Sequence, residues 1–260
     1  MKRAEDLTGR PSESAGAIGL PRPEWVMLKQ PSMARRRLAC FPFAGGGVSL
    51  YRPWASEVAP DVELVSLLLP GREQRLLEPP LTDLVQVAQL AALAMQQLRP
   101  LPTVFFGHSM GALLAYESLR ASADTIACIC LAVSGSSAPG FPRAIRRVGE
   151  MTDSMFIDYL GSMGGTPREV LEQPEMMELL LPMLRADFGM VDDYRPCTNR
   201  QPLTCPLLAF QGSDDPATST EGVAAWADVT RGSSVAKSLP GGHFFISEQV
   251  GPILRALSIA

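Results

Sequence analysis

The residues with the clearest chemical potential form the glycine-flanked segment Gly107-His108-Ser109-Met110-Gly111. This segment follows the apolar run TVFF and precedes an amphipathic helical pattern, so Ser109 is expected on a tight strand-to-helix turn. Such a turn crowds the backbone, and a glycine two positions to either side relieves the crowding. The turn would present the Ser109 hydroxyl above the sheet as a nucleophile. A glycine-rich turn with a chance serine is the alternative, and the flanking strand and helix patterns disfavour it.

A serine hydroxyl becomes a good nucleophile only when a positioned base removes its proton, and histidine suits that task near neutral pH. The sequence has two histidines. His108 lies next to Ser109, where its side chain should point away from the hydroxyl, so we assign it a structural role. His243 lies in the turn LPGGHFF after an apolar run, and it is therefore the expected base.

A catalytic histidine also needs a carboxylate that fixes its tautomer and stabilises the imidazolium. Asp214 and Asp215 follow the apolar run PLLAF in the segment QGSDDP. We favour Asp215 for this role and interpret Asp214 as a turn former. The resulting order along the chain, Ser, Asp, His, is the order found in α/β-hydrolases.

A glycine-rich segment, CFPFAGGG, follows the first strongly apolar run. Its turn can aim the backbone N–H of Ala44 at the point above Ser109, where the N–H of Met110 would be the second donor of an oxyanion hole. A phosphate-binding loop is the alternative. The Lys-Ser/Thr pair of a P-loop is missing, however, and the glycines do not form a G-x-G-x-x-G motif.

Short apolar runs alternate with helical patterns along most of the chain, which predicts an α/β fold with a mostly parallel sheet flanked by helices. The expected strands cover residues 37–42, 62–68, 103–106, 126–133, 206–210 and 234–239, and the expected helices cover 82–98, 110–120, 219–229 and 247–258. The four chemistry-bearing segments all follow predicted strands. They should therefore meet at the carboxyl edge of the sheet, where open α/β sheets bind ligands.

The predicted domain organisation has three parts. Residues 1–33 are rich in Gly, Pro, Ser and charge and are expected to be a disordered or weakly ordered tail. Residues 34–260 are expected to form one α/β-hydrolase domain. Within it, residues 138–200 interrupt the strand-helix alternation with a helical pattern, which predicts an inserted lid. Seven of the twelve methionines fall in this lid, between Met151 and Met190, and suggest an adaptable apolar cover.

Composition excludes several classes of protein and site. The 260 residues carry a net charge of only −4 with no long basic run, which argues against nucleic acid as a partner. Five cysteines without a Cys-x-x-Cys pair indicate neither a disulfide framework nor a zinc site. We expect neither a metal nor a cofactor. We also expect no membrane association, because no apolar run reaches a membrane-spanning length. A cytoplasmic location and a monomer are further expectations.

From about Arg37 to its end the chain resembles the type II thioesterases that accompany polyketide synthases and nonribosomal peptide synthetases. The motifs that carry the resemblance are CFPFAGGG, YRPWA, LPGREQRLLEPPLTDL, FFGHSMGALLAYE, DDYRP, FQGSDDP and PGGHFFI. The pair formed by Pro-Gly-Arg-Glu (Pro70 to Glu73) and His-Ser-Met-Gly is more specific to that family than the serine turn alone.

The resemblance implies hydrolysis of acyl thioesters on the 4'-phosphopantetheine arm of a carrier protein, which clears stalled or misprimed chains. It places the triad on Ser109, Asp215 and His243 and the oxyanion donors on Ala44 and Met110. One departure is Phe43, where relatives commonly have histidine, and another is a longer amino-terminal extension. The alternatives are an esterase or acyltransferase of the same fold acting on small free esters, and a catalytically silent module that only binds carrier proteins.

Overall fold

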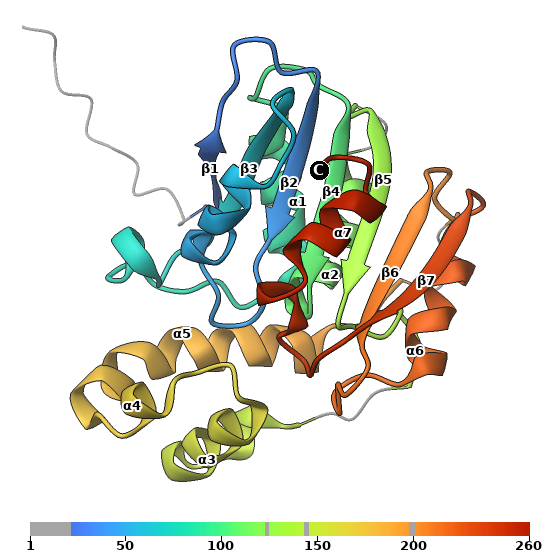
Figure 1. Cartoon of the computed structure of the whole chain (residues 1–260). Coiled ribbons are helices and arrows are strands. Elements are labelled where there is room, and N and C mark those ends of the chain that lie inside the picture. The colour runs from blue at the N-terminus through green and yellow to red at the C-terminus, as the bar shows by residue number, and fades with distance from the viewer. Residues whose placement is uncertain (1–21, 123–124, 143–145, 198–200) are drawn as a thin grey trace, which may run out of the picture.

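The computed structural model describes residues 22–122, 125–142, 146–197 and 201–260, in which the apolar runs pair into a twisted seven-stranded sheet (Figure 1). The strands are β1 (Glu24–Lys29), β2 (Arg36–Phe41), β3 (Val62–Leu68), β4 (Thr103–His108), β5 (Cys128–Ser134), β6 (Leu207–Gly212) and β7 (Ser234–Leu239). Their order in the sheet is β1-β3-β2-β4-β5-β6-β7. All neighbours are parallel except β1 and β3. The mostly parallel α/β architecture is as predicted.

The first strand corrects the expected amino-terminal tail. Residues 24–29 form β1, which runs antiparallel to β3 at the edge of the sheet. Trp25 donates a hydrogen bond from its indole N–H to the Ala91 carbonyl at 2.9 Å and packs edge-on against Phe41. These contacts give the short run EWVMLK enough burial to be ordered, so a tail reaching residue 33 is wrong here. Residues 1–21 lie outside the described part of the chain.

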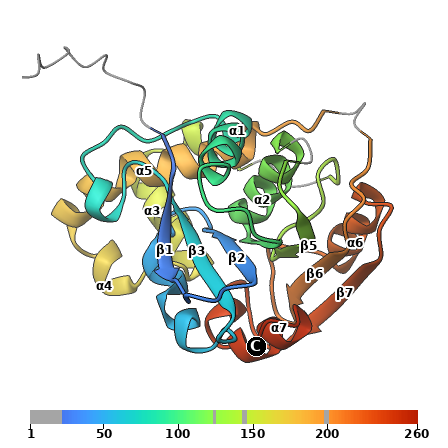
Figure 2. The ribbon, with the colours of Figure 1, turned by 90° about the horizontal axis from the view of Figure 1, so that it is seen from above.

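Helices cover both faces of the sheet (Figure 2). Helices α1 (Leu84–Met95) and α2 (Met110–Ala121) pack on one face, while the 3₁₀ segment Val48–Ser56 and α7 (Val250–Ala256) pack on the other. Successive β2 residues alternate between the two cores: Ala39 lies in the first and Cys40 in the second. A fifth covering element is α6 (Thr220–Ala224), which continues as a 3₁₀ turn. No helix of the described residues is long and apolar enough to cross a membrane.

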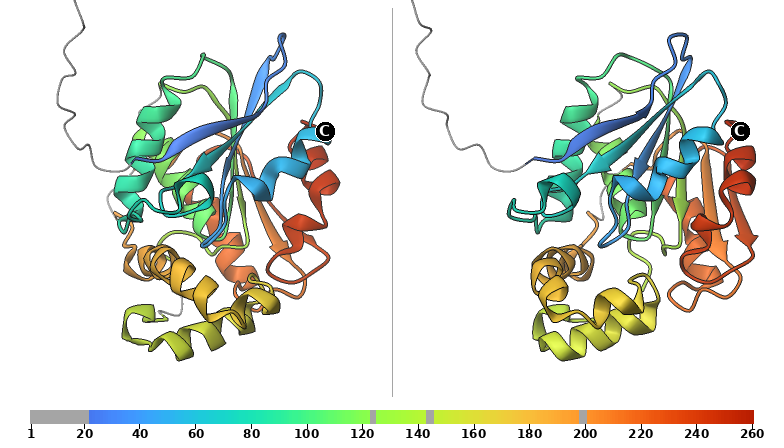
Figure 3. Two further views of the ribbon diagram at one scale, coloured as in Figure 1. Left: turned by 90° about the vertical axis from the view of Figure 1, so that its left-hand side faces the viewer. Right: turned by 60° about the vertical axis from the view of Figure 1, so that its left-hand side comes forward.

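Three further helices lie between β5 and β6: α3 (Asp153–Met163), α4 (Arg168–Leu171) and α5 (Pro174–Asp193). They gather off the carboxyl ends of the strands, in the place of the expected lid (Figure 3). Phe156, Leu160, Met177 and Leu184 form part of a small separate core among these helices. The lid therefore has its own packing and covers the edge where the sequence places the catalytic segments.

The start of α2 approaches the end of β2 so closely that only glycine fits at the contact. A Cβ atom built on Gly111 would lie 2.1 Å from the Phe41 carbonyl oxygen, and one on Gly107 would lie 1.9 Å from the Gly111 oxygen. Both obstacles are backbone atoms, which cannot move aside as a flexible side chain can. This contact sets the distance between the Ser109 turn and the glycine-rich loop after β2.

Replacing Gly111 with Ala should therefore lower the free energy of unfolding by about 3 kcal/mol, the upper part of the range for overpacked sites. Gly189→Ala is the matched control, because a Cβ at this position of α5 meets nothing within 4 Å. The control should stabilise the helix by about 0.5–1 kcal/mol. Urea unfolding of both variants measures the difference, and a neutral Gly111→Ala would contradict the close approach.

Candidate active site

Ser109 sits in a strained backbone conformation between β4 and α2. Its φ of 56° and ψ of −117° lie where residues other than glycine are rarely found. The turn is held on both sides: the Ser109 N–H donates to the Ser134 carbonyl at 2.8 Å, and the Ala112 N–H donates to the Ser109 carbonyl at 3.0 Å. This geometry lifts the hydroxyl off the end of the sheet, as the sequence predicted for this segment.

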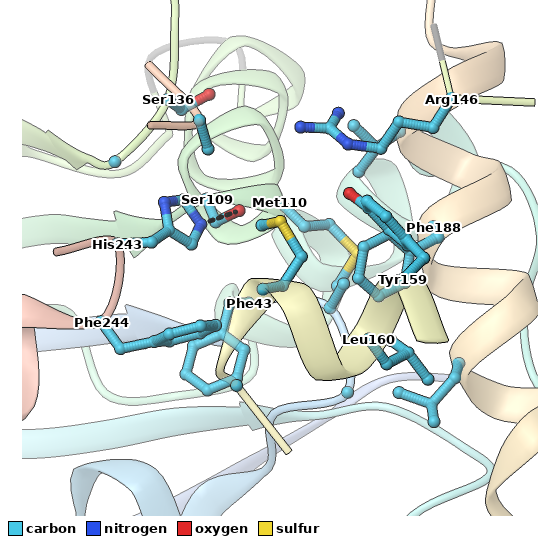
Figure 4. A pocket seen from close by; sticks show the side chains of 18 of the residues that line it. Phe43, Ser109, Met110, Ser136, Arg146, Tyr159, Leu160, Phe188, His243 and Phe244 are labelled. Carbon is cyan, nitrogen blue, oxygen red and sulfur yellow. Dashed lines mark hydrogen bonds between the residues drawn. The ribbon is translucent and has the colours of Figure 1, made fainter. Parts of the chain in front are cut away.

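The three residues proposed as a catalytic triad lie in one hydrogen-bonded chain. His243 Nε2 is 3.1 Å from the Ser109 hydroxyl, and His243 Nδ1 is 2.9 Å from Asp215 Oδ2 (Figure 4). His243 and Asp215 are each only 7% exposed. Asp215 follows β6 and His243 follows β7, so parallel strands deliver both groups to the same edge as Ser109. The arrangement allows His243 to accept the Ser109 proton while Asp215 fixes the ring.

The two neighbouring aspartates have different surroundings. Burial alone would raise the pKa of Asp215, but the hydrogen bond and charge of His243, with the Ala217 N–H and Thr218 hydroxyl, lower the net pKa below its ordinary value. The Ala217 N–H and the Thr218 hydroxyl lie 2.8 and 2.9 Å from its oxygens. Asp215 is therefore an ionised, oriented carboxylate. Asp214 is exposed and accepts a hydrogen bond from the Ser213 hydroxyl, as expected for a turn residue.

His108, the residue before Ser109, is fully buried. Its Nδ1 lies 3.0 Å from the Ser134 hydroxyl, and its ring packs near Phe43, Phe245 and His243. Burial lowers the pKa of His108 well below its ordinary value, and the nearby His243 lowers it further. His108 is thus a neutral packing residue, the role that the sequence suggested.

The expected oxyanion donors both border the nucleophile. Ala44 lies in the loop after β2, and Met110 is the first residue of α2, where backbone N–H groups lack helical acceptors. Both residues line one cavity with Ser109 and His243. The Gly46 N–H donates to the Phe43 carbonyl at 2.8 Å and closes the turn that contains Ala44.

This cavity has a volume of about 620 Å³ and a largely apolar wall that the lid helices help to build. In Figure 4, Phe244 lies to one side of Ser109, and Tyr159, Phe188 and Arg146 lie to the other. Phe43 also lines the cavity. Its ring packs against that of Phe244 with centroids 4.9 Å apart. The volume and apolar wall suit an acyl chain.

The lid residues that form the wall could not be selected from the sequence. Tyr159 lies on α3 and Phe188 on α5, in amphipathic patterns whose apolar faces serve both the lid core and the cavity. Only Met163 and Met183 of the seven lid methionines line the cavity; Met177 packs into the lid core, and Met155 is exposed. Aromatic rings contribute to the cover more than the methionine count suggested.

Asp215→Asn should lower turnover of an acyl ester or thioester by about 10⁴-fold, because a neutral amide neither fixes the productive His243 tautomer nor stabilises its imidazolium. Asp214→Asn is the matched control and should stay within a few-fold of the unchanged protein. Steady-state kinetics on both folded variants provide the comparison. A larger loss in Asp214→Asn would move the carboxylate role by one residue.

The neutral state of His108 makes stability depend on pH. Because the folded pKa lies below the unfolded value of about 6.5, the unfolded chain binds the extra proton, and stability falls as pH drops below about 6.5. One such proton contributes up to ~1.4 kcal/mol per pH unit. His108→Gln should remove this contribution, so its free energy of unfolding should fall less steeply between about pH 6.5 and about pH 5. Equal slopes in urea unfolding of both proteins would show that His108 is protonated when folded.

Comparison with known proteins agrees with this geometry. Residues 36–259 match the thioesterase domain family. The chain is 40% identical over 219 residues to gramicidin S biosynthesis protein GrsT of Aneurinibacillus migulanus, covering 84% of this chain and 85% of the relative.

Solved structures are similar over most of the chain. The type II thioesterase BorB from the borrelidin biosynthetic cluster has a TM-score of 0.83 and 30% identity, covering 90% of this chain and 96% of that chain. YbtT, the type II thioesterase of the yersiniabactin NRPS/PKS pathway, has a TM-score of 0.81 at 30% identity with the same coverage. The family match, these likenesses and the serine-centred site agree that the chain belongs to the thioesterase family of α/β-hydrolase fold and is a thioester hydrolase.

Proposed function

We propose that this protein hydrolyses acyl thioesters held on the phosphopantetheine arm of carrier proteins, as an editing type II thioesterase in polyketide or nonribosomal peptide biosynthesis. The observation that supports this most directly is the Ser109–His243–Asp215 chain, which opens onto a large apolar cavity under a helical lid. The relatives named for gramicidin S, borrelidin and yersiniabactin biosynthesis support the biosynthetic setting.

The proposed reaction begins when the Ser109 hydroxyl attacks the thioester carbonyl carbon and gives its proton to His243 Nε2. The carbonyl oxygen becomes negatively charged and receives hydrogen bonds from the backbone N–H groups of Ala44 and Met110. Asp215 stabilises the imidazolium. The C–S bond then breaks, the sulfur takes the proton from His243, and the acyl group remains on Ser109 as an ester.

Water completes the cycle by the same route. His243 removes a proton from the water as it attacks the ester carbonyl, and returns that proton to the Ser109 oxygen when the ester bond breaks. The products are a free acid and a carrier arm with a free thiol. In each half of the cycle the positive charge on His243 and the negative charge on the carbonyl oxygen form and disappear together, so the transfers balance without a metal or cofactor.

The cavity wall supports a substrate range broader than a single acyl group. Its apolar side chains form the larger part of the wall and include the flexible Met163 and Met183, while polar side chains such as Arg146 and Tyr159 form the rest. A wall of this kind distinguishes acyl chains mainly by size, and one methylene changes binding by only about 1–3 kcal/mol. An editing enzyme, which must accept several misplaced acyl groups, benefits from such tolerance. We also propose a cytoplasmic location, to which the free thiols of Cys40, Cys128, Cys130 and Cys205 are suited.

Kinetic assays on acyl-carrier proteins and on free esters of the same acyl groups distinguish the candidate functions. Release of the carrier thiol should show a higher kcat/KM for the carrier-bound thioester than for the matched free ester, with modest variation among acyl chains of different length. Ser109→Ala should lose up to about 10⁶-fold in turnover and stay folded. Higher kcat/KM on free esters would indicate the esterase, and folded protein inactive on every substrate would indicate a carrier-binding module.

A further inference from the structure

A buried ion pair joins the lid to the loop region beside the nucleophile. Arg72 lies in the segment after β3, and Asp187 lies in the second half of α5, the last lid helix. Two parallel contacts of 2.8 Å connect Arg72 Nη1 to Asp187 Oδ2 and Arg72 Nη2 to Asp187 Oδ1. The two side chains are 4% and 0% exposed. The cavity is lined by other residues, and the proposed reaction uses neither Arg72 nor Asp187.

Both members of the pair also hold the loop that contains Ala44. The Gly45 N–H donates to Asp187 Oδ2 at 2.8 Å, and Arg72 Nη1 donates to the Gly46 carbonyl at 2.9 Å. One carboxylate oxygen therefore receives bonds from the guanidinium and from the loop backbone. The pair holds an N–H and a carbonyl in the two residues that directly follow Ala44.

The lid helix also packs directly on this loop. Gly45 has a φ of +81°, and a Cβ atom there would lie 2.6 Å from Leu184, one helical turn before Asp187. On the other side, Glu73 accepts the Ser49 N–H at 2.8 Å, and its carboxylate occupies the space beside Gly47. The loop is thus held from the lid and from the Pro-Gly-Arg-Glu segment together.

Stability alone is a weak reason for an ion pair in this place. The cost of removing two charges from water offsets much of their attraction, and apolar side chains of similar size often stabilise a fold as well or better. An apolar pair, however, could not accept the Gly45 N–H or donate to the Gly46 carbonyl. What the charged pair adds is a fixed orientation of the peptide units that follow Ala44.

We propose that Arg72 and Asp187 are positioning residues that hold the Ala44 N–H in the orientation needed for the oxyanion. This inference rests on the proposed role of Ala44 as an oxyanion donor. Because Asp187 belongs to α5, the position of this lid helix determines the orientation of the backbone that forms the oxyanion hole. A displacement of α5 would withdraw the acceptor from Gly45 and disorganise the hole, so full activity requires the lid helix in this position.

The test replaces the pair with apolar residues in the double variant Arg72→Met/Asp187→Leu, which leaves no unpaired buried charge. The matched control is Arg37→Met/Glu63→Leu. This second pair is also buried, at 2.6 Å, but lies at the amino ends of β2 and β3, the far end of the sheet from Ser109. Each variant is measured for kcat, KM, melting temperature and affinity for a straight-chain alkylboronic acid, which forms a tetrahedral adduct with an active serine.

The first double variant should lose about 10²-fold in kcat with little change in KM, because the oxyanion develops only after substrate has bound. Its affinity for the boronic acid should fall by a similar factor, since the tetrahedral adduct uses the same hole. The control should keep both values within a few-fold. Unchanged kcat and boronic acid affinity in the first variant, or equal losses in the control, would overturn the inference.

A third variant covers the case in which the double variant does not fold. Arg72→Lys keeps a positive charge beside Asp187 but cannot make two parallel bonds and also reach the Gly46 carbonyl. It should lose about tenfold in kcat at an unchanged melting temperature, and full activity would overturn the inference. If the proposed function is wrong, the unaltered enzyme itself will not hydrolyse the carrier-bound thioester. The kcat of each variant relative to that of the unaltered enzyme can then be measured on a free ester.

Discussion

The strained turn at Ser109 is the constraint on which the rest of the site depends. A positive-φ conformation of this kind at a serine costs about 1–3 kcal/mol and persists only when neighbouring structure enforces it. Here the hydrogen bond to Ser134 and the close approach of Gly111 to the Phe41 carbonyl enforce it. The same approach brings the end of β2 beside the start of α2. The loop that contains Ala44 therefore begins within reach of the nucleophile before any lid contact is made.

The burial and hydrogen-bond partners of each polar group around this turn, more than its residue type, determine what it does. Two histidines lie with ring centroids 5.0 Å apart, yet only His243 meets both a hydroxyl and a carboxylate. His108, whose pKa burial lowers well below its ordinary value, stays neutral and packs among aromatic rings. One proton-accepting group thus faces Ser109, and the second histidine contributes shape without adding charge beneath the site.

The sequence predicted those features that depend on local pattern. The run 62–68 and the run 234–239 are strands with the predicted bounds, and the Ser, Asp, His order led to three residues that the fold brings together. Strand β1 was missed because its six residues follow a segment rich in Pro, Gly and charge, and they are ordered by tertiary contacts: pairing with β3 and the packing of Trp25. Antiparallel pairing of an edge strand also lies outside the strand-helix alternation that predicted the other six.

The sequence could not predict the contacts between distant segments of ordinary composition. Arg72 and Asp187 are 115 positions apart, and each resembles a solvated charge until the fold buries it. Likewise, the inward faces of α3 and α5 became identifiable only when the lid was placed over the sheet edge. These tertiary contacts connect the lid to the loop beside Ser109, and they decide how the cavity is closed.

Covalent labelling with a fluorophosphonate, followed by peptide mass spectrometry, tests whether Ser109, activated by His243, is the nucleophile. We expect one adduct, on the peptide that contains Ser109, with a labelling rate that falls by several orders of magnitude in His243→Ala. An adduct on a different serine, or labelling of Ser109 at the same rate without His243, would contradict it.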